Sequence, residues 1–270
     1  MRTADLPVKI FATLTYLVMV VTNYLANALP LNGRQTGEIS DAYENLFAPA
    51  GITFSIWGLI YLLLAIHLLY QWGLFHKDGV ANGKLLRKVA VLFSVSSLAN
   101  TAWVFAWHYD QILLSTLLIA TILVLLATIV VTLRDSQLTS REQWLVRVPF
   151  SVYFGWITVA TVANITVWLV SIGWDGFGIP IQIWAVIIIA VAALIGTLVM
   201  LANRDFAYGV VLLWAFTGIL IKHTAADGFA GRYPEVIGTV IACLVAFLVA
   251  EFVLWRRRGE AAWITRPAGE

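Results

Sequence analysis

Eight long apolar segments, joined by short polar connections, constrain the fold of this chain more than any other feature of its sequence. They cover roughly residues 10–29, 52–74, 89–108, 111–133, 146–171, 180–202, 206–222 and 236–255. Most have the ~20 residues that a helix needs to cross ~30 Å of hydrocarbon. Only 12% of the residues are charged and the mean hydropathy is +0.87, values typical of polytopic helical membrane proteins. We therefore predict an all-α membrane protein with eight transmembrane helices.

The placement of Lys and Arg predicts the orientation of these helices. If both termini lie inside, three of the 17 basic residues, Arg34, Lys222 and Arg232, lie outside and the other 14 lie in the cytoplasm. The positive-inside rule expects such an imbalance. Without the short segment 206–222, the basic cluster at residues 256–258 would move to the outer side. We therefore expect eight crossings of a bacterial or archaeal cytoplasmic membrane, with both termini cytoplasmic.

One face of the fifth segment is aromatic and polar. At 100° per residue, a single stripe about 120° wide contains Tyr153, Trp156, Ala160, Asn164 and Trp168. An amide at membrane depth is costly unless it finds a partner. This face should therefore point into the helix bundle.

Three other segments repeat this pattern. The corresponding stripes are Tyr16, Asn23 and Asn27 on the first segment; Phe54, Trp57, Tyr61, Leu68 and Trp72 on the second; and Ser96, Asn100, Trp103 and Trp107 on the third. For one helix, interfacial aromatic residues and amides that join helices explain such a stripe. Four stripes together favour a shared pocket.

Three motifs on these segments resemble those of a known family. Residues 48–61 read Ala-Pro-Ala-Gly-Ile-Thr-Phe-Ser-Ile-Trp-Gly-Leu-Ile-Tyr, Asn100 precedes Trp103 by three positions, and the fifth segment carries the stripe described above. In this order they resemble the signatures of the tryptophan-rich sensory protein family, also called the translocator protein or peripheral benzodiazepine receptor family. The resemblance covers about residues 10–171. It implies a five-helix bundle with a cavity for a flat apolar ligand, foremost a tetrapyrrole such as porphyrin or haem, and second a sterol-like molecule.

The chain departs from the family pattern around this cavity. Gly51 stands where the family has a Trp, Ala48 and Val152 stand where it has Pro, and Ser96 replaces a frequent Gln. These changes leave the identity of the ligand open. We divide the chain into a five-helix transmembrane domain over residues 1–174 and a three-helix extension with a basic cytoplasmic tail over residues 175–270, which has no counterpart in the five-helix family.

The longest connection, residues 30–51, lies on the outer side. The spacing of Ile39, Tyr43, Leu46 and Phe47 allows a short amphipathic helix within residues 36–47, with Ser40 as a candidate N-cap. Long ordered loops often act as lids. We therefore predict that Ile39, Tyr43 and Phe47 belong to a lid over the outward mouth of the bundle; a solvated connector is the alternative.

We predict a ligand site between the first, second, third and fifth helices, in the outer half of the membrane. Its residues are Trp57, Tyr61, Asn100, Trp103, Tyr153, Trp156 and Asn164. The rings offer stacking surfaces and the two amides offer hydrogen bonds. We therefore expect a membrane receptor or sensor. A small-solute transporter or exporter is the alternative, although such proteins usually keep charges or broken helices at mid-depth; an inert scaffold is the third.

Other chemistries find little support in the sequence. It contains no HExxH motif, no His pair at i, i+4, no nucleophile elbow and no phosphate-binding Gly loop. We expect His67 to pack rather than to bind haem, and Lys222 to reach the outer interface rather than to hold a retinal. We thus predict no enzyme, no required cofactor, no metal site and no nucleic-acid partner. The expected partners are membrane lipid and the small apolar ligand, and a homodimer is left open.

The predicted orientation can be tested with topology reporters. A reporter fused after residue 270 should lie in the cytoplasm, because this orientation places 14 of the 17 basic residues inside, as the positive-inside rule expects. Activity of a periplasmic reporter, such as alkaline phosphatase, at that position would contradict it.

Overall fold

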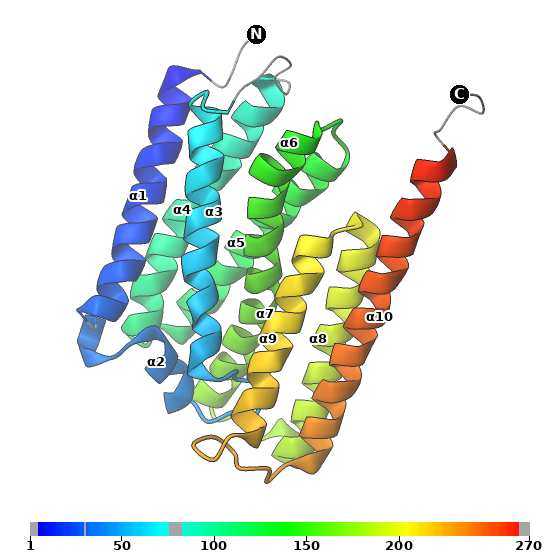
Figure 1. The fold of residues 1–270 in the computed structure, drawn as a ribbon. Coiled ribbons are helices and arrows are strands. Elements are labelled where there is room, and N and C mark those ends of the chain that lie inside the picture. The colour runs from blue at the N-terminus through cyan, green and yellow to red at the C-terminus, as the bar shows by residue number, and fades with distance from the viewer. Residues whose placement is uncertain (1–4, 30, 76–82, 265–270) are drawn as a thin grey trace.

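The computed structural model describes residues 5–29, 31–75 and 83–264, and in this part of the chain its regular elements are all helices (Figure 1). The α-helices are α1 (Leu6–Ala28), α2 (Thr36–Ala42), α3 (Ile56–Gln71), α4 (Gly83–His108), α5 (Ile112–Arg134), α6 (Ser140–Glu142), α7 (Val148–Ser171), α8 (Ile181–Asn203), α9 (Phe206–Thr224) and α10 (Pro234–Ile264). Short turns of other helix types are η1 (Leu31–Gly33), η2 (Gly51–Ser55), the π-helical η3 (Gln143–Arg147) and η4 (Gly176–Gly178).

Eight stretches of the described chain are long and apolar enough to cross a membrane, which confirms the predicted all-α membrane fold. The shortest of them is the 19-residue α9, the segment on which the predicted topology depends. The main differences from the predicted bounds lie at the basic end of the bundle. There α4 begins at Gly83 rather than at residue 89, and the helix that leads into α7 begins at Ser140 rather than at residue 146. Polar first turns can be helical outside the hydrocarbon, so hydropathy alone places these starts too late.

The helices form one bundle in which α7 occupies a central position (Figure 1). On one side α1 packs on α4, α4 on α5, and α5 on α7; on the other side α7 packs on α9, and both α8 and α9 pack on α10. A Cβ on Gly155 of α7 would lie 2.9 Å from Cβ of Val211, so this glycine lets α7 and α9 approach closely. The chain enters α1 and leaves α10 at the same end of the bundle, opposite α2 (Figure 1).

His67 of α3 contacts a backbone carbonyl of the neighbouring helical segment, that of Leu145. Pro149 has no N–H to donate to the carbonyl of Leu145, four residues earlier. Nδ1 of the buried His67 lies 3.1 Å from this carbonyl oxygen, and Nε2 lies 2.7 Å from Nε2 of Gln71. Since a carbonyl only accepts, Nδ1 carries the hydrogen and Nε2 accepts from the Gln71 amide. His67 therefore packs, as expected, with both ring nitrogens engaged.

This arrangement predicts a coupling between His67 and Pro149. We expect His67→Phe to lower the free energy of unfolding by ~1–3 kcal/mol, because it leaves the buried Leu145 carbonyl without its donor. In a Pro149→Ala background the same change should cost clearly less, because the introduced alanine can supply the missing N–H. A double-mutant cycle, measured by reversible unfolding in mixed micelles, gives the coupling. Equal costs in the two backgrounds would contradict this explanation.

Candidate functional site

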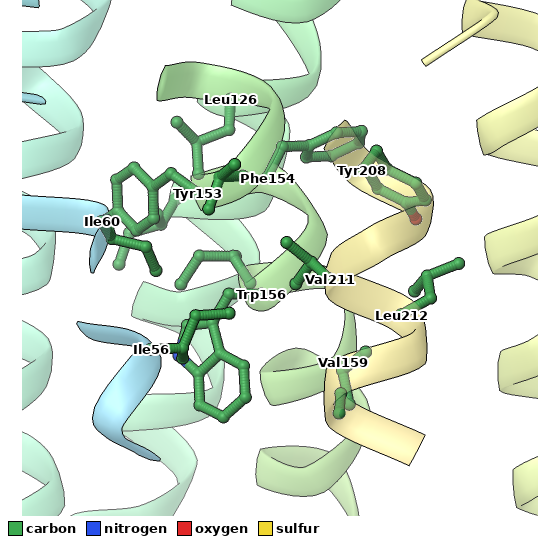
Figure 2. Close-up of a cluster of buried hydrophobic side chains, with 14 of the residues drawn as sticks. Ile56, Ile60, Leu126, Tyr153, Phe154, Trp156, Val159, Tyr208, Val211 and Leu212 are labelled. Carbon is green, nitrogen blue, oxygen red and sulfur yellow. The ribbon is translucent and has the colours of Figure 1, made fainter. Parts of the chain in front are cut away.

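The structure brings the aromatic residues of three helices together around Trp57 of α3. The centroid of its ring lies 5.6 Å from that of Tyr61, 5.9 Å from Tyr153, 6.2 Å from Trp156 and 6.4 Å from Trp103. Such distances and the mixture of stacked and edge-to-face angles are typical of attractive aromatic contacts. Figure 2 shows Tyr153 and Trp156 on the side of α7 that faces α3, whereas Phe154 points toward Tyr208 of α9. Five of the seven predicted site residues therefore form one cluster.

The two remaining predicted residues, Asn100 of α4 and Asn164 of α7, lie at the border of this cluster and are buried. The amide of Asn100 donates to the hydroxyl of Tyr153 at 3.2 Å and accepts from the amide of Asn23 at 2.8 Å. These bonds join α1, α4 and α7. A buried amide with such partners stabilises the bundle.

Asn164 is bound on both sides as well. Its Oδ1 accepts from the indole N–H of Trp103 at 2.9 Å, and its Nδ2 donates to the hydroxyls of Ser115 at 3.0 Å and Thr116 at 3.1 Å. This amide therefore joins α4, α5 and α7. That either asparagine also contacts a ligand stays a prediction.

Two polar groups of the cluster have no such partner. The indole N–H of Trp156 and the hydroxyl of Tyr61 are buried and make no hydrogen bond with any described residue. A buried polar group without a partner costs about 1–3 kcal/mol. Such groups are rare in folded proteins and usually have a functional reason.

Two hollows adjoin the cluster. A small one of ≈ 40 Å³ lies beside Trp103, Trp156 and Asn164, and a large one of ≈ 750 Å³ lies between α1, α2 and α3 and reaches Tyr61. Both are lined by Thr36, Pro49, Phe54 and Trp57, so the rings of Phe54 and Trp57 form part of the wall between them. The ring of Phe54 also meets that of Trp156 edge-on, with centroids 5.7 Å apart. The space at the predicted ligand site is thus divided by side chains, and of these two hollows the large one has the ~300–1,000 Å³ of typical ligand pockets.

The predicted short helix in the outer connection is present as α2, but it begins earlier than expected. Gln35, not Ser40, is its N-cap, because Gln35 and Glu38 form a reciprocal capping box. Ile39 on α2 and Phe47 beyond it are fully buried, whereas Tyr43 at its C-cap is half-buried. Ser40 itself is buried and lines the small hollow.

Hydrogen bonds join this segment to α4. The indole of Trp107 donates to the carbonyl of Thr36 at 3.1 Å, and the hydroxyl of Tyr43 donates to the carboxylate of Asp110 at 3.2 Å. Arg34 forms an ion pair with the same carboxylate. Burial and the negative charge of Asp110 raise the pKa of Tyr43 against the opposing effect of Arg34, so the phenol stays protonated and donates. Residues 34–49 thus lie against the bundle; their action as a lid stays a prediction.

Helix α9 holds the following stretch of the outer connection in place. The carbonyl of Gly218 accepts from the N–H of Ala50 at 3.0 Å, and the indole of Trp214 donates to the carbonyl of Thr53 at 2.9 Å. Nε2 of His223 lies 2.9 Å from the carbonyl oxygen of Leu46.

Lys222 adds an ion pair to these bonds, with 3.0 Å between its Nζ and Oδ1 of Asp41. It lies at a helix end, as predicted, but binds this loop rather than only reaching the interface. Sequence reasoning missed all four contacts with α9. The signal for them in the sequence is the pair of polar residues Lys222 and His223 at the end of an apolar segment.

Potential metal ligands are scattered. The structure contains no group of three or more His, Cys, Asp or Glu residues that could hold a metal ion, in the ranges that it describes. Cys243 is buried on α10.

The contact between Gly218 and Thr53 predicts how α9 controls the outer connection. A Cβ on Gly218 would lie 2.0 Å from Oγ1 of Thr53, so Gly218→Ala must push this turn away. We expect amide hydrogen exchange over residues 45–53 to accelerate about tenfold or more, equivalent to ~1.4 kcal/mol of lost local stability. Gly238→Ala on α10 is the matched control, because a Cβ there meets nothing within 4 Å. Equal exchange in the two variants would show that α9 does not hold the turn.

Comparison with known proteins gives one match. The sequence model of a family described as TSPO-like protein matches residues 9–258. No curated protein and no solved structure matches the chain. The matched range extends through α8 and α9 into α10, so the resemblance does not end near residue 171, where the sequence motifs end. The expectation that the last three helices lie outside the family pattern is therefore wrong.

Proposed function

The chain belongs to the TSPO-like protein family, and on this premise we propose that it is an integral membrane receptor that binds a flat apolar ligand among the rings around Trp57. A tetrapyrrole such as porphyrin is the ligand class that we favour, followed by sterol-like molecules. The proposed contacts are stacking on the Trp and Tyr rings and one or two hydrogen bonds to their polar atoms.

The unpartnered donor of Trp156 carries this proposal. Its side chain is 2% exposed and lines the small hollow, and its N–H has no acceptor among the described residues. An acceptor on a ligand, such as a pyrrole nitrogen or a carboxylate, would relieve this cost. The Tyr61 hydroxyl offers a second unpartnered group on the side of the large hollow.

The two hollows suggest how the ligand reaches this donor. The large hollow, at ≈ 750 Å³, has the size of a ligand pocket, and the amides of Asn23, Asn27 and Gln35 line it. A flat ligand there would meet the rings of Phe54 and Trp57, the partition toward Trp156. Rotation of these two side chains would join the hollows into one slot below α2. The small hollow alone, at ≈ 40 Å³, has no room for a tetrapyrrole.

The proposal predicts an unusual response to Trp156→Phe. Phenylalanine keeps an aromatic ring but removes the N–H, so porphyrin affinity should fall about tenfold, as expected for one lost hydrogen bond of ~1.4 kcal/mol. The stability of the ligand-free protein should stay the same or rise, because an unpartnered buried donor is removed. Titration of the purified protein, followed by the Soret shift and Trp quenching, measures affinity; thermal unfolding measures stability.

Trp184→Phe is the matched control, because its indole already donates to the carbonyl of Gly176 at 2.6 Å, away from the cluster. It should leave porphyrin affinity unchanged and lower stability slightly. An affinity of Trp156→Phe equal to that of the unaltered protein would remove the central support for the site. No Soret shift with the unaltered protein would overturn the tetrapyrrole assignment itself.

A further inference from the structure

A second cavity lies on the other side of α7 and shares no residue with either hollow of the aromatic cluster. This crevice of ≈ 900 Å³ lies between α3, α9 and the start of α7. Its back wall is formed by Val148, Ser151 and Val152. On the outer side it ends near η2, which contacts α9. The crevice therefore bridges the junction between the five N-terminal membrane helices and the three that follow.

The middle of the crevice is apolar and open toward the membrane. Leu59 of α3 is 49% exposed, and Val210 and Trp214 of α9 are 58% and 40% exposed. All three side chains line the crevice at positions within membrane-spanning helices. An occupant of this part must therefore present hydrocarbon.

The other end of the crevice is cationic. Arg147 and Arg204 both line it, at the end of the bundle that carries the basic connections. The Arg147 side chain is 15% exposed, donates to the carbonyl of Asn203 at 2.6 Å, and places Nε 3.8 Å from a carboxylate oxygen of Asp205. Arg204 is the C-cap of α8 in the left-handed conformation, at φ 50°, so its backbone is fixed by the tight turn into α9.

Among the residues that line the crevice, Asp205 is the one acidic residue beside these two arginines. Asp205 is 4% exposed, and its oxygens also accept from the hydroxyl of Ser151 at 2.5 Å and from the N–H of Tyr208 at 3.2 Å. It is thus engaged as the N-cap of α9 and in the ion pair with Arg147. The lining of the crevice therefore holds two arginines and one carboxylate. A hydrocarbon-lined groove that ends in arginines at the membrane surface fits an amphipathic anion.

From this combination we propose that the crevice is a binding site for an anionic phospholipid, with an acyl chain between α3 and α9 and the phosphate at Arg147 and Arg204. A zwitterionic phospholipid can fill the groove as well, but its cationic head group offsets the attraction between its phosphate and the arginines. Since the lipid would contact both α3 and α9, it should stabilise the junction between the two parts of the bundle. The proposal does not depend on the ligand of the aromatic cluster.

Lipid titrations of the full-length protein test this site. The delipidated protein in a neutral detergent is titrated with phosphatidylglycerol and with phosphatidylcholine of identical acyl chains, and native mass spectrometry counts the bound lipid. We expect phosphatidylglycerol to bind about fivefold more tightly, as expected for one arginine at a membrane surface. We also expect it to raise the midpoint of thermal unfolding. Glycerol phosphate, which has no acyl chain, should have neither effect at the same concentration.

Three variants test the contribution of the charge and that of the groove separately. Arg204→Gln should abolish the preference for phosphatidylglycerol, whereas Arg87→Gln, an exposed arginine on α4 outside the crevice, should preserve it. Val210→Trp should fill the groove and weaken the binding of both lipids. Equal binding of the two lipids by the unaltered protein overturns the proposal. So does an equal preference in the two arginine variants, or unchanged lipid binding in Val210→Trp. Tighter binding of a fatty acid than of phosphatidylglycerol would replace the phospholipid by a carboxylate ligand.

Discussion

The requirement that polar groups inside a membrane find partners within the protein organises this structure. Hydrocarbon supplies no hydrogen bonds, so each amide or ring nitrogen on an inward helix face must be paired by another helix. Asn100 is paired by α1 and α7, Asn164 by α4 and α5, and His67 by the carbonyl that Pro149 leaves without a donor. Several buried polar atoms have no partner among the described residues, and those in the aromatic cluster are the indole N–H of Trp156 and the hydroxyl of Tyr61, which is why we propose the ligand contact there.

Of the three C-terminal helices, α9 contacts the connection between α2 and α3 beside the candidate site. Helix α9 shares no lining residue with the two hollows beside Trp57, yet it binds the stretch of residues 41–53 that leads from α2 into α3. Three of these contacts use backbone carbonyls and one is the ion pair of Lys222 with Asp41. These contacts join α9 to residues 41–53. The family match likewise includes α9, since it runs to residue 258.

The sequence predicts those features that depend on periodicity and charge. Hydropathy predicts the eight helices, and the spacing of Trp57, Trp103, Tyr153 and Trp156 places them on faces that do meet. The sequence does not predict that the space at the ligand site is divided into two hollows, because the rotamers of Phe54 and Trp57 depend on packing across helices. Nor does it predict the contacts of α9 with Leu46, Ala50 and Thr53, since every residue offers the same backbone groups. The start of α2 was misplaced because Ser is the more frequent N-cap, whereas here Gln35 and Glu38 cap each other.

The central claim is that the indole N–H of Trp156 is a hydrogen-bond donor kept for the ligand. Nuclear magnetic resonance of the protein with ¹⁵N-labelled indoles tests it most directly, because the 12 Trp residues give separate N–H signals and a Trp156→Phe variant identifies one of them. We predict that porphyrin shifts the Trp156 signal, through the new hydrogen bond and the ring current of the macrocycle, while the signal of Trp184 stays in place. A bound porphyrin that leaves the Trp156 signal unchanged and shifts that of Trp214 in the α3–α9 crevice would contradict the account.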